Sequence, residues 1–175
     1  MSALTQITEM TGMTELGFSE LSSLLWQERE ALELLLFKLV EERLIVAAGE
    51  AKWLAAANRE VESVVEQLQA VEVQRAVEVE LISRDLNAGG DLSLNELAAA
   101  AGEPWAGILL DHRTKLTALV AEIDQAADQN RALLSAGARS IRETMLTLTE
   151  SVDTYDAHGA PSPNAPRSMI MDEQA

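Results

Sequence analysis

Residues 21–46 read LSSLLWQEREALELLLFKLVEERLIV. Apolar side chains recur in this stretch at alternating steps of four and three residues, and Glu28 and Glu42 fill the two remaining places of the same rhythm. The apolar positions are Leu21, Leu25, Leu32, Leu35, Leu39 and Val46. This heptad spacing places one row of side chains along one face of a helix, where it packs against a second helix. The stretch therefore predicts a long helix of the coiled-coil type.

A second stretch of the same kind follows, because the chain between Glu20 and Leu86 contains no proline and only one glycine, Gly49. Its rhythm is interrupted at Glu72 and Arg75. The positions that follow the rhythm are Leu54, Asn58, Val61, Val65, Leu68, Val79, Ile82 and Leu86. We expect two helices that meet near residues 48–50 and form an antiparallel hairpin. A kink and a true turn at Gly49 are both compatible with this pattern.

A loop and a short helix are predicted next. Residues 87–91 carry the pair Gly89-Gly90, which is typical of a helix end and a loop. Ser93 and Glu96 have the spacing of a capping box, so a short helix should begin there, continue to Ala101 and end at Gly102.

The third long helix is expected from Pro104 to about Thr154, a length of about 75 Å at 1.5 Å per residue. Its apolar stripe makes two successive steps of four next to Gly137, and such a stutter turns the stripe toward a different direction. The stripe comprises Leu116, Val120, Ile123, Ala127, Asn130 and Leu134, and then Ala138, Ile141, Met145, Leu148, Val152 and Tyr155. The two halves of the helix can therefore face different partners. Periodicity alone leaves open whether the second half is core or a surface for another protein.

Composition narrows the class of protein. The chain has 175 residues, 13 basic and 29 acidic side chains and a net charge of −16, with 47% apolar and 3% aromatic residues. So acidic a surface disfavours nucleic acid and anionic membranes as partners. The chain has no cysteine, no run of eighteen apolar residues and no basic start followed by an apolar run, which fits a cytoplasmic protein. We expect a flexible N-terminus over residues 1–18, one helical domain over 19–155 and a disordered tail over 156–175, where glycine and prolines gather.

The sequence predicts neither an enzyme nor a cofactor. Its only neutral-pH bases are His112 and His158, and His158 lies in the expected tail. His112 has no metal ligand three or four positions away on its helix, so we expect an ordinary surface histidine there. Residues 85–96 meet most of the calcium-loop pattern, with Gly89 lacking a ligand oxygen and Ser93 and Glu96 needed for the cap. Calcium binding by this loop stays open.

Trp105-Ala106-Gly107 is the W-x-G tripeptide of small helical-hairpin secretion substrates. Those substrates keep the tripeptide in the turn between two helices, whereas here it opens a long helix. The second reading is that Trp105 is an apolar anchor at the helix start.

The chain resembles the FlgN family of bacterial flagellar chaperones of the type III export pathway over about residues 21–159. The resemblance rests on four segments in this order: Leu25 to Leu32 (LWQEREAL), Leu94 to Ala98 (LNELA), Asn130 to Leu134 (NRALL) and Thr154 to Gly159 (TYDAHG). It implies a cytoplasmic, non-enzymatic, all-helical chaperone that holds hook-filament junction proteins unassembled and brings them to the export apparatus.

The resemblance also implies a substrate-binding region in the C-terminal part of the chain. Its residues here are Leu133, Leu134, Ile141, Met145, Leu148 and Val152. A local basic cluster of Arg131, Arg139 and Arg142 could steer acidic substrate flanks or be plain helix surface. Tyr155 falls where the family keeps a tyrosine, which suggests a contact with the export gate. A structural coiled-coil protein that forms homo-oligomers through the same stripes is the alternative from another class.

Overall fold

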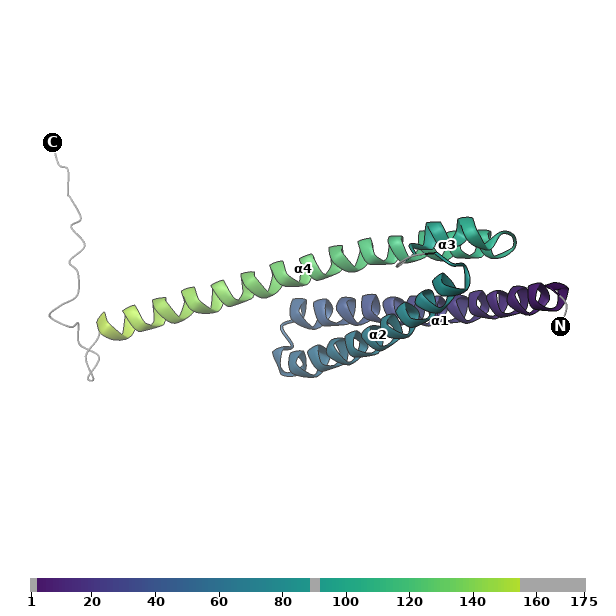
Figure 1. Cartoon of the computed structure of the whole chain (residues 1–175). Helices are drawn as coiled ribbons and strands as arrows, with labels where there is room; N and C mark the ends of the chain where they lie inside the picture. Colours follow the sequence, from purple (N-terminus) through teal and green to yellow (C-terminus); the bar gives the residue numbers. More distant parts are fainter. Residues whose placement is uncertain (1–2, 89–91, 155–175) are drawn as a thin grey trace, which may run out of the picture. The chain divides into compact units, whose positions relative to one another are not determined.

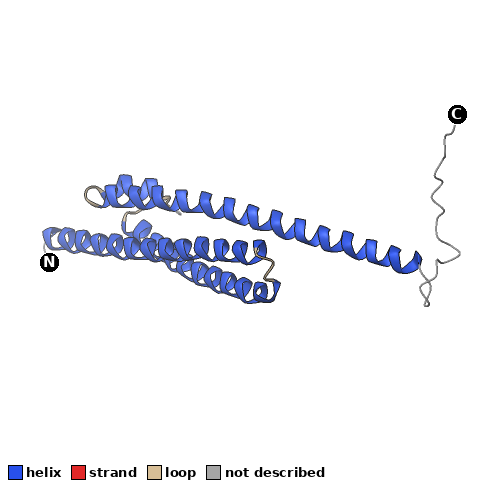
Figure 2. Ribbon diagram, turned by 180° about the vertical axis from the view of Figure 1, so that it is seen from behind, coloured by secondary structure: helices blue, strands red, loops and turns tan. Residues whose placement is uncertain are grey.

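The computed structural model describes residues 3–88 and 92–154, with side chains for residues 15–88 and 92–147. In these residues the chain forms α1 (Ala3–Ala47), α2 (Ala51–Asp85), α3 (Leu94–Ala101) and α4 (Trp105–Thr154), as Figure 1 shows. The described residues contain no strand, and Figure 2 shows helices joined by short loops. The prediction of an all-α fold is confirmed.

The chain divides into two compact units, Met1–Arg131 and Ala132–Ala175. The first unit contains α1, α2, α3 and the first part of α4, and the second contains the remainder of α4. Each unit is considered by itself below.

Gly49 breaks the first long helical region. Its φ of +71° lies in the left-handed region, where a side chain would be strained. The reversal is closed by two backbone hydrogen bonds, from Gly49 N–H to the Val46 carbonyl and from Glu50 N–H to the Ile45 carbonyl, both 3.1 Å long. α1 and α2 consequently run side by side in opposite directions (Figures 1 and 2).

The predicted inner face of α1 is confirmed for every position except the last, since Val46 is only half-buried. Leu21 and Leu25 have no exposed surface, and the two glutamates of the rhythm are buried with them. The inner face of α2 agrees with the prediction at Val79 and Ile82, which are buried, and differs from it in part of the N-terminal half. Its N-terminal half turns Ala57 and Val64 into the core, while Asn58 is exposed and donates a 2.7 Å hydrogen bond to Glu62.

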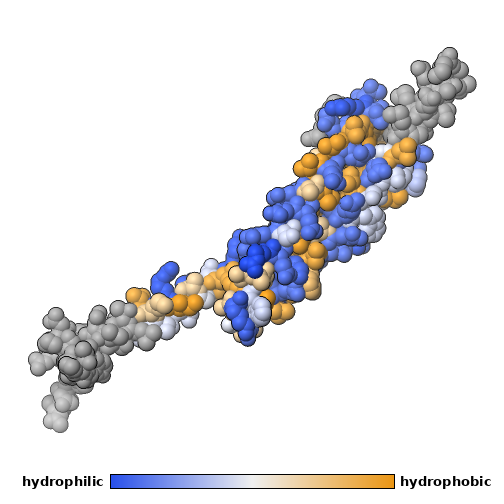
Figure 3. Space-filling model, turned by 90° about the horizontal axis from the view of Figure 1, so that it is seen from below, coloured by the Kyte–Doolittle hydropathy of each residue, from blue (hydrophilic) through white to orange (hydrophobic). Residues whose placement is uncertain are grey.

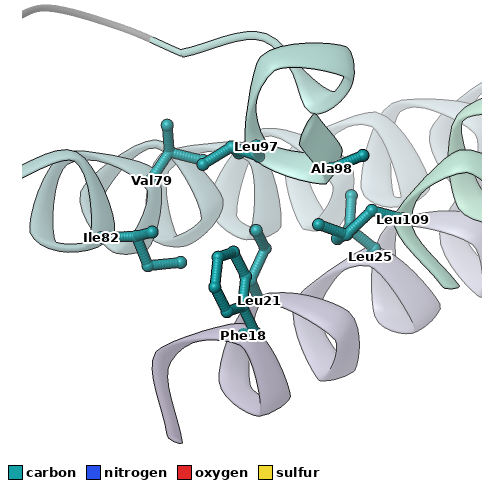
Figure 4. Close-up of a cluster of buried hydrophobic side chains, with 8 residues drawn as sticks. All are labelled: Phe18, Leu21, Leu25, Val79, Ile82, Leu97, Ala98 and Leu109. Carbon is teal, nitrogen blue, oxygen red and sulfur yellow. The ribbon is translucent and has the colours of Figure 1, made fainter. Parts of the chain in front are cut away.

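One end of the first unit holds the larger buried cluster, which takes side chains from all four helices (Figure 4). Its members are Phe18, Leu21, Leu25, Val79, Ile82, Leu97, Ala98 and Leu109. A helix as short as α3 is not stable alone in water. It is held because Leu97 and Ala98 are buried in this cluster and because its first turn is capped.

The cap of α3 confirms the predicted capping box. Ser93 Oγ accepts a 3.3 Å hydrogen bond from the Glu96 N–H, and the Ser93 N–H donates a 2.8 Å bond to the Glu96 carboxylate. Hydrogen bonds from the Ser93 hydroxyl and N–H lower the pKa of Glu96. Gly102, with φ +66°, ends the helix as predicted.

A second buried cluster joins α1, α2 and α4 nearer the Gly49 turn. It consists of Leu35, Leu39, Val64 and Ala126. Ile123 and Ala127 pack against it, as the periodicity of α4 predicts. Val120 was expected in the same stripe, but its side chain is 46% exposed. The buried positions of α4 are Leu109, His112, Ala126 and Asn130, so the inner face runs beside Val120 and includes small and polar residues.

Two buried polar contacts accompany these clusters. Glu28 of α1 pairs with Arg75 of α2 at 2.8 Å, which explains why the apolar rhythm of α2 is interrupted there. Asn130 Nδ2 of α4 donates to both the Leu39 carbonyl and the Glu42 carboxylate of α1, each at 2.8 Å. The ion pair brings opposite charges together and the two bonds from Asn130 satisfy its amide nitrogen, but Asn130 Oδ1 is buried without a hydrogen-bond partner among the described residues.

The predicted domain limits, including a flexible segment over residues 1–18, stay predictions. α1 begins at Ala3, and Phe18 is only 2% exposed and belongs to the apolar cluster of Figure 4. Over the described residues, no helix combines the length and apolar character needed to cross a membrane.

Candidate partner-binding face

The second unit contains the part of α4 that carries the predicted substrate-binding residues. Every side chain described there, from Ala132 to Thr147, is exposed. Leu133 and Leu134 are each 37% exposed, Ile141 62% and Met145 65%. The four residues therefore lie on the surface of the chain, which is where a partner could reach them.

The central row of this surface is apolar. Leu134, Ala138, Ile141 and Met145 follow one another at steps of four, three and four residues, so they share one side of the helix. Apolar side chains in such a row bind the apolar stripe of another helix.

The row on one side of it is basic. Arg131, Ser135, Arg139, Arg142 and Leu146 follow at steps of four, four, three and four. Members of this row come one residue after members of the apolar row, a turn of about 100° around the helix. The arginines therefore lie along one edge of the apolar row.

The row on the other side is small and uncharged beyond its first leucine. It consists of Leu133, Gly137, Ser140, Thr144 and Thr147. The Thr144 hydroxyl donates to the Ser140 carbonyl at 2.9 Å and the Thr147 hydroxyl to the Glu143 carbonyl at 3.0 Å. Because the Thr144 and Thr147 hydroxyls donate within their own helix, covering them with a partner would leave neither of these two donors unsatisfied.

The three predicted arginines are all exposed. Arg131 is paired with Asp128, 3.1 Å away and three residues before it. Exposed pairs of this kind contribute little to stability, so the arginine remains available to a partner at small cost. Between residues 131 and 147 the only acidic residue is Glu143, which makes this segment basic in a strongly acidic chain.

The remaining predicted residues fall at or beyond the limit of the described side chains. Leu148 and Val152 lie in α4, but their side chains are outside the described residues. Tyr155 lies outside them altogether.

Leu146 belongs to the surface and was not predicted. Its side chain is 59% exposed and follows Arg142 in the basic row. The heptad spacing did not predict Leu146, because this residue lies one position after Met145 of the apolar row. The step of four from Arg142 could have identified it.

His112 corrects the prediction of a surface histidine. Its side chain is 3% exposed, its Nε2 lies 3.1 Å from Ser22 Oγ, and its ring meets the edge of Trp26 at 5.3 Å between centroids. Burial lowers its pKa; Asp111 raises it and Arg29 lowers it by smaller amounts. The predicted stripe of this helix began at Leu116 and so did not include residue 112.

The described residues contain no group of three or more His, Cys, Asp or Glu side chains arranged to hold a metal ion. In the calcium-like loop, Asp85 is the last residue of α2 and Glu96 is bound to Ser93 at 2.6 Å, while residues 89–91 lie outside the described residues. Calcium binding remains untested.

Trp105 begins α4, as predicted, and its half-buried ring lies 6.3 Å from that of Phe18. Trp105 also packs against the cluster of Figure 4. These contacts match the reading of Trp105 as an apolar anchor.

The fold and this face define an all-helical protein with an exposed helix surface that carries an apolar row and a basic row beside it. The family model described as "FlgN protein" matches residues 10–163. The chain belongs to the FlgN family, which consists of non-enzymatic flagellar export chaperones. It has no significant match among curated proteins or solved structures.

Proposed function

We propose that this chaperone binds hook-filament junction proteins through the three rows of α4 described above, prevents their premature assembly and aids their delivery to the type III export apparatus in the cytoplasm. The observation that carries the proposal is the exposure of Leu134, Ile141 and Met145 along one side of a helix. A helical face that is apolar and exposed is a common site for an amphipathic partner helix.

The physical mechanism is competition for an apolar stripe. A terminal helix that assembles a filament must present apolar side chains to its neighbours, and those side chains are exposed before assembly. Pairing them with Ile141 and its row withholds them from other subunits. Ordering a disordered segment lowers the net affinity, which suits a complex that must later release its substrate.

The arginines add orientation. Arg139 and Arg142 lie along only one edge of the apolar row, so a partner helix with carboxylates along one edge is favoured in one direction. The same positive charges would raise the rate of association with an acidic partner helix at low ionic strength. Tyr155 is proposed as a contact with the export gate, following the family resemblance alone.

The proposal is tested by mixing the full chain with a purified junction protein and measuring the complex by size-exclusion chromatography with light scattering and by calorimetry. We expect a defined heterocomplex that Ile141→Glu weakens at least about tenfold, because a carboxylate would be buried among apolar groups. Val120→Glu is the matched control, since Val120 is an exposed apolar residue of the same helix but lies in the first unit.

Loss of binding in both variants, or in neither, would contradict this assignment of the site. Absence of any complex with the unmodified chain would contradict the function itself. The alternative, a structural homo-oligomer, predicts a stable oligomer and no heterocomplex in the same measurement.

A further inference from the structure

The outer face of α2 also carries exposed apolar side chains. Val73, Val77 and Leu81 follow at steps of four residues and are 65%, 53% and 45% exposed. The inner face of the same helix turns Val79 and Ile82 into the core. Val73, Val77 and Leu81 are thus additional to the core of the first unit, and we call them the α2 outer row. Figure 3 shows apolar side chains, in orange, at the surface among hydrophilic ones in blue.

The α2 outer row lies among acidic residues. Glu66, Val73 and Glu80 are spaced by seven residues, so both glutamates share the direction of Val73. From residue 60 to residue 80 the chain has six glutamates and a single basic residue, Arg75, which is directed to Glu28 on α1. Arg84, beyond this range, pairs with Glu80.

These properties complement those of the segment 131–147 of α4. Residues 131–147 have three arginines and one glutamate, whereas residues 60–80 have one arginine and six glutamates. The row from Leu134 to Met145 extends about 16 Å and the α2 outer row about 12 Å, so the two are of similar length. Both are exposed apolar rows on helices, with opposite charge beside them.

We propose that the α2 outer row is the docking surface for the 131–147 segment of a second copy of this chain. A reciprocal pair related by a two-fold axis would cover both surfaces in both copies. Such a homodimer holds the partner-binding face covered until a substrate competes for it. The competition rests on the proposed function; the self-association does not.

The self-association is tested on the full chain by sedimentation velocity over a concentration series at low and high salt. We expect a monomer–dimer equilibrium whose dissociation constant rises about tenfold or more between about 0.05 and 0.5 M salt, because exposed charges are screened. Val77→Glu should raise the dissociation constant at least about tenfold. Val120→Glu is the control, being the same substitution at a valine 46% exposed, and it should leave the dimer unchanged.

A charge exchange makes the test specific. Arg139→Glu with Arg142→Glu in one chain should weaken its dimer, and mixing it with a chain carrying Glu66→Arg and Glu80→Arg should restore association. A monomer at all concentrations would overturn the proposal, as would a dimer that Val77→Glu leaves intact. Binding of a junction protein is measured separately, and monomeric Val77→Glu should retain it. Failure there, with the dimer result as expected, would contradict the proposed function and leave the self-association standing.

Discussion

Arg75 Nε on α2 lies 2.8 Å from Glu28 Oε2 on α1, and the Glu28 side chain is only 10% exposed. Burial raises the pKa of Glu28; Arg75 lowers it by attraction and a hydrogen bond, and Glu72 raises it further. The net direction is upward, so the loss of hydration outweighs the attraction of the arginine. The pair connects the two helices of the hairpin at a place where apolar packing would otherwise be expected.

Arg75→Met should destabilise the protein by about 2 kcal/mol, because it leaves the Glu28 charge without its partner. The effect should be smaller than at a fully buried pair, since Arg75 keeps 32% of its side-chain exposure. Denaturant unfolding at neutral pH measures it. The double variant Glu28→Leu/Arg75→Met is the control and should lie within about 1 kcal/mol of the unmodified chain. A double variant less stable than Arg75→Met would show that the pair itself stabilises the hairpin.

The raised pKa of Glu28 has a consequence for pH dependence. A carboxyl group with a raised pKa in the folded state favours folding while protonated, and this contribution is lost as pH rises from the ordinary value of 4.5 through the raised value. Glu28→Gln cannot ionise, so its stability relative to the unmodified chain should increase over that range. Chemical unfolding at a series of pH values measures the difference. A difference that does not change with pH would contradict the burial effect.

His112 should titrate in the opposite sense. Burial holds its pKa below the ordinary value of 6.5, so the unfolded chain binds a proton more readily than the folded one. Its contribution to stability should be fully present above pH 6.5 and fall as pH decreases from there. His112→Gln keeps a polar group near Ser22 and should remove this part of the pH dependence. Equal slopes for the two proteins between about pH 7.5 and 5.5 would show that His112 is not involved.

Two glycines should respond oppositely to alanine. Gly49 has φ +71° and no atom within 4 Å of the place that a Cβ would occupy, so Gly49→Ala is opposed by the backbone alone and should cost about 1 kcal/mol. Gly137 lies inside α4 with open space around it, so Gly137→Ala should increase the helix content of the second unit. Circular dichroism and thermal unfolding measure both. Destabilisation by Gly137→Ala would show that the helix needs flexibility there.

The sequence predicted the helices well and their inner faces less well. Large leucines define the inner face of α1, and every one of them is buried as predicted. Ala57 occupies an inner position with little apolar surface, so its neighbour Asn58 was assigned by rhythm and proved exposed. Val120 was assigned by the same rhythm and is also exposed. A polar residue such as His112 gives no apolar signal, and only its contact across 90 residues with Ser22 reveals its burial.

The candidate face could be predicted in outline for the same reason. Its leucines, Ile141 and Met145 stand out in the sequence, but periodicity is identical for a buried row and an exposed one. Their exposure became evident only from the fold. The position of the arginines along one edge of the apolar row follows from their spacing on a continuous helix. Their role in binding depends on the charges of the partner, which the sequence of this chain does not contain.

The most direct test of the partner-binding face is hydrogen exchange of the full chain with and without a purified junction protein. Alone, and at a concentration low enough to keep the chain monomeric, the segment from Ala132 to Thr147 should exchange faster than the first part of α4, since none of its described side chains is buried. On binding, we expect protection to increase most in this segment. Unchanged exchange there, with protection gained elsewhere in a complex that does form, would contradict the claim that this face holds the partner.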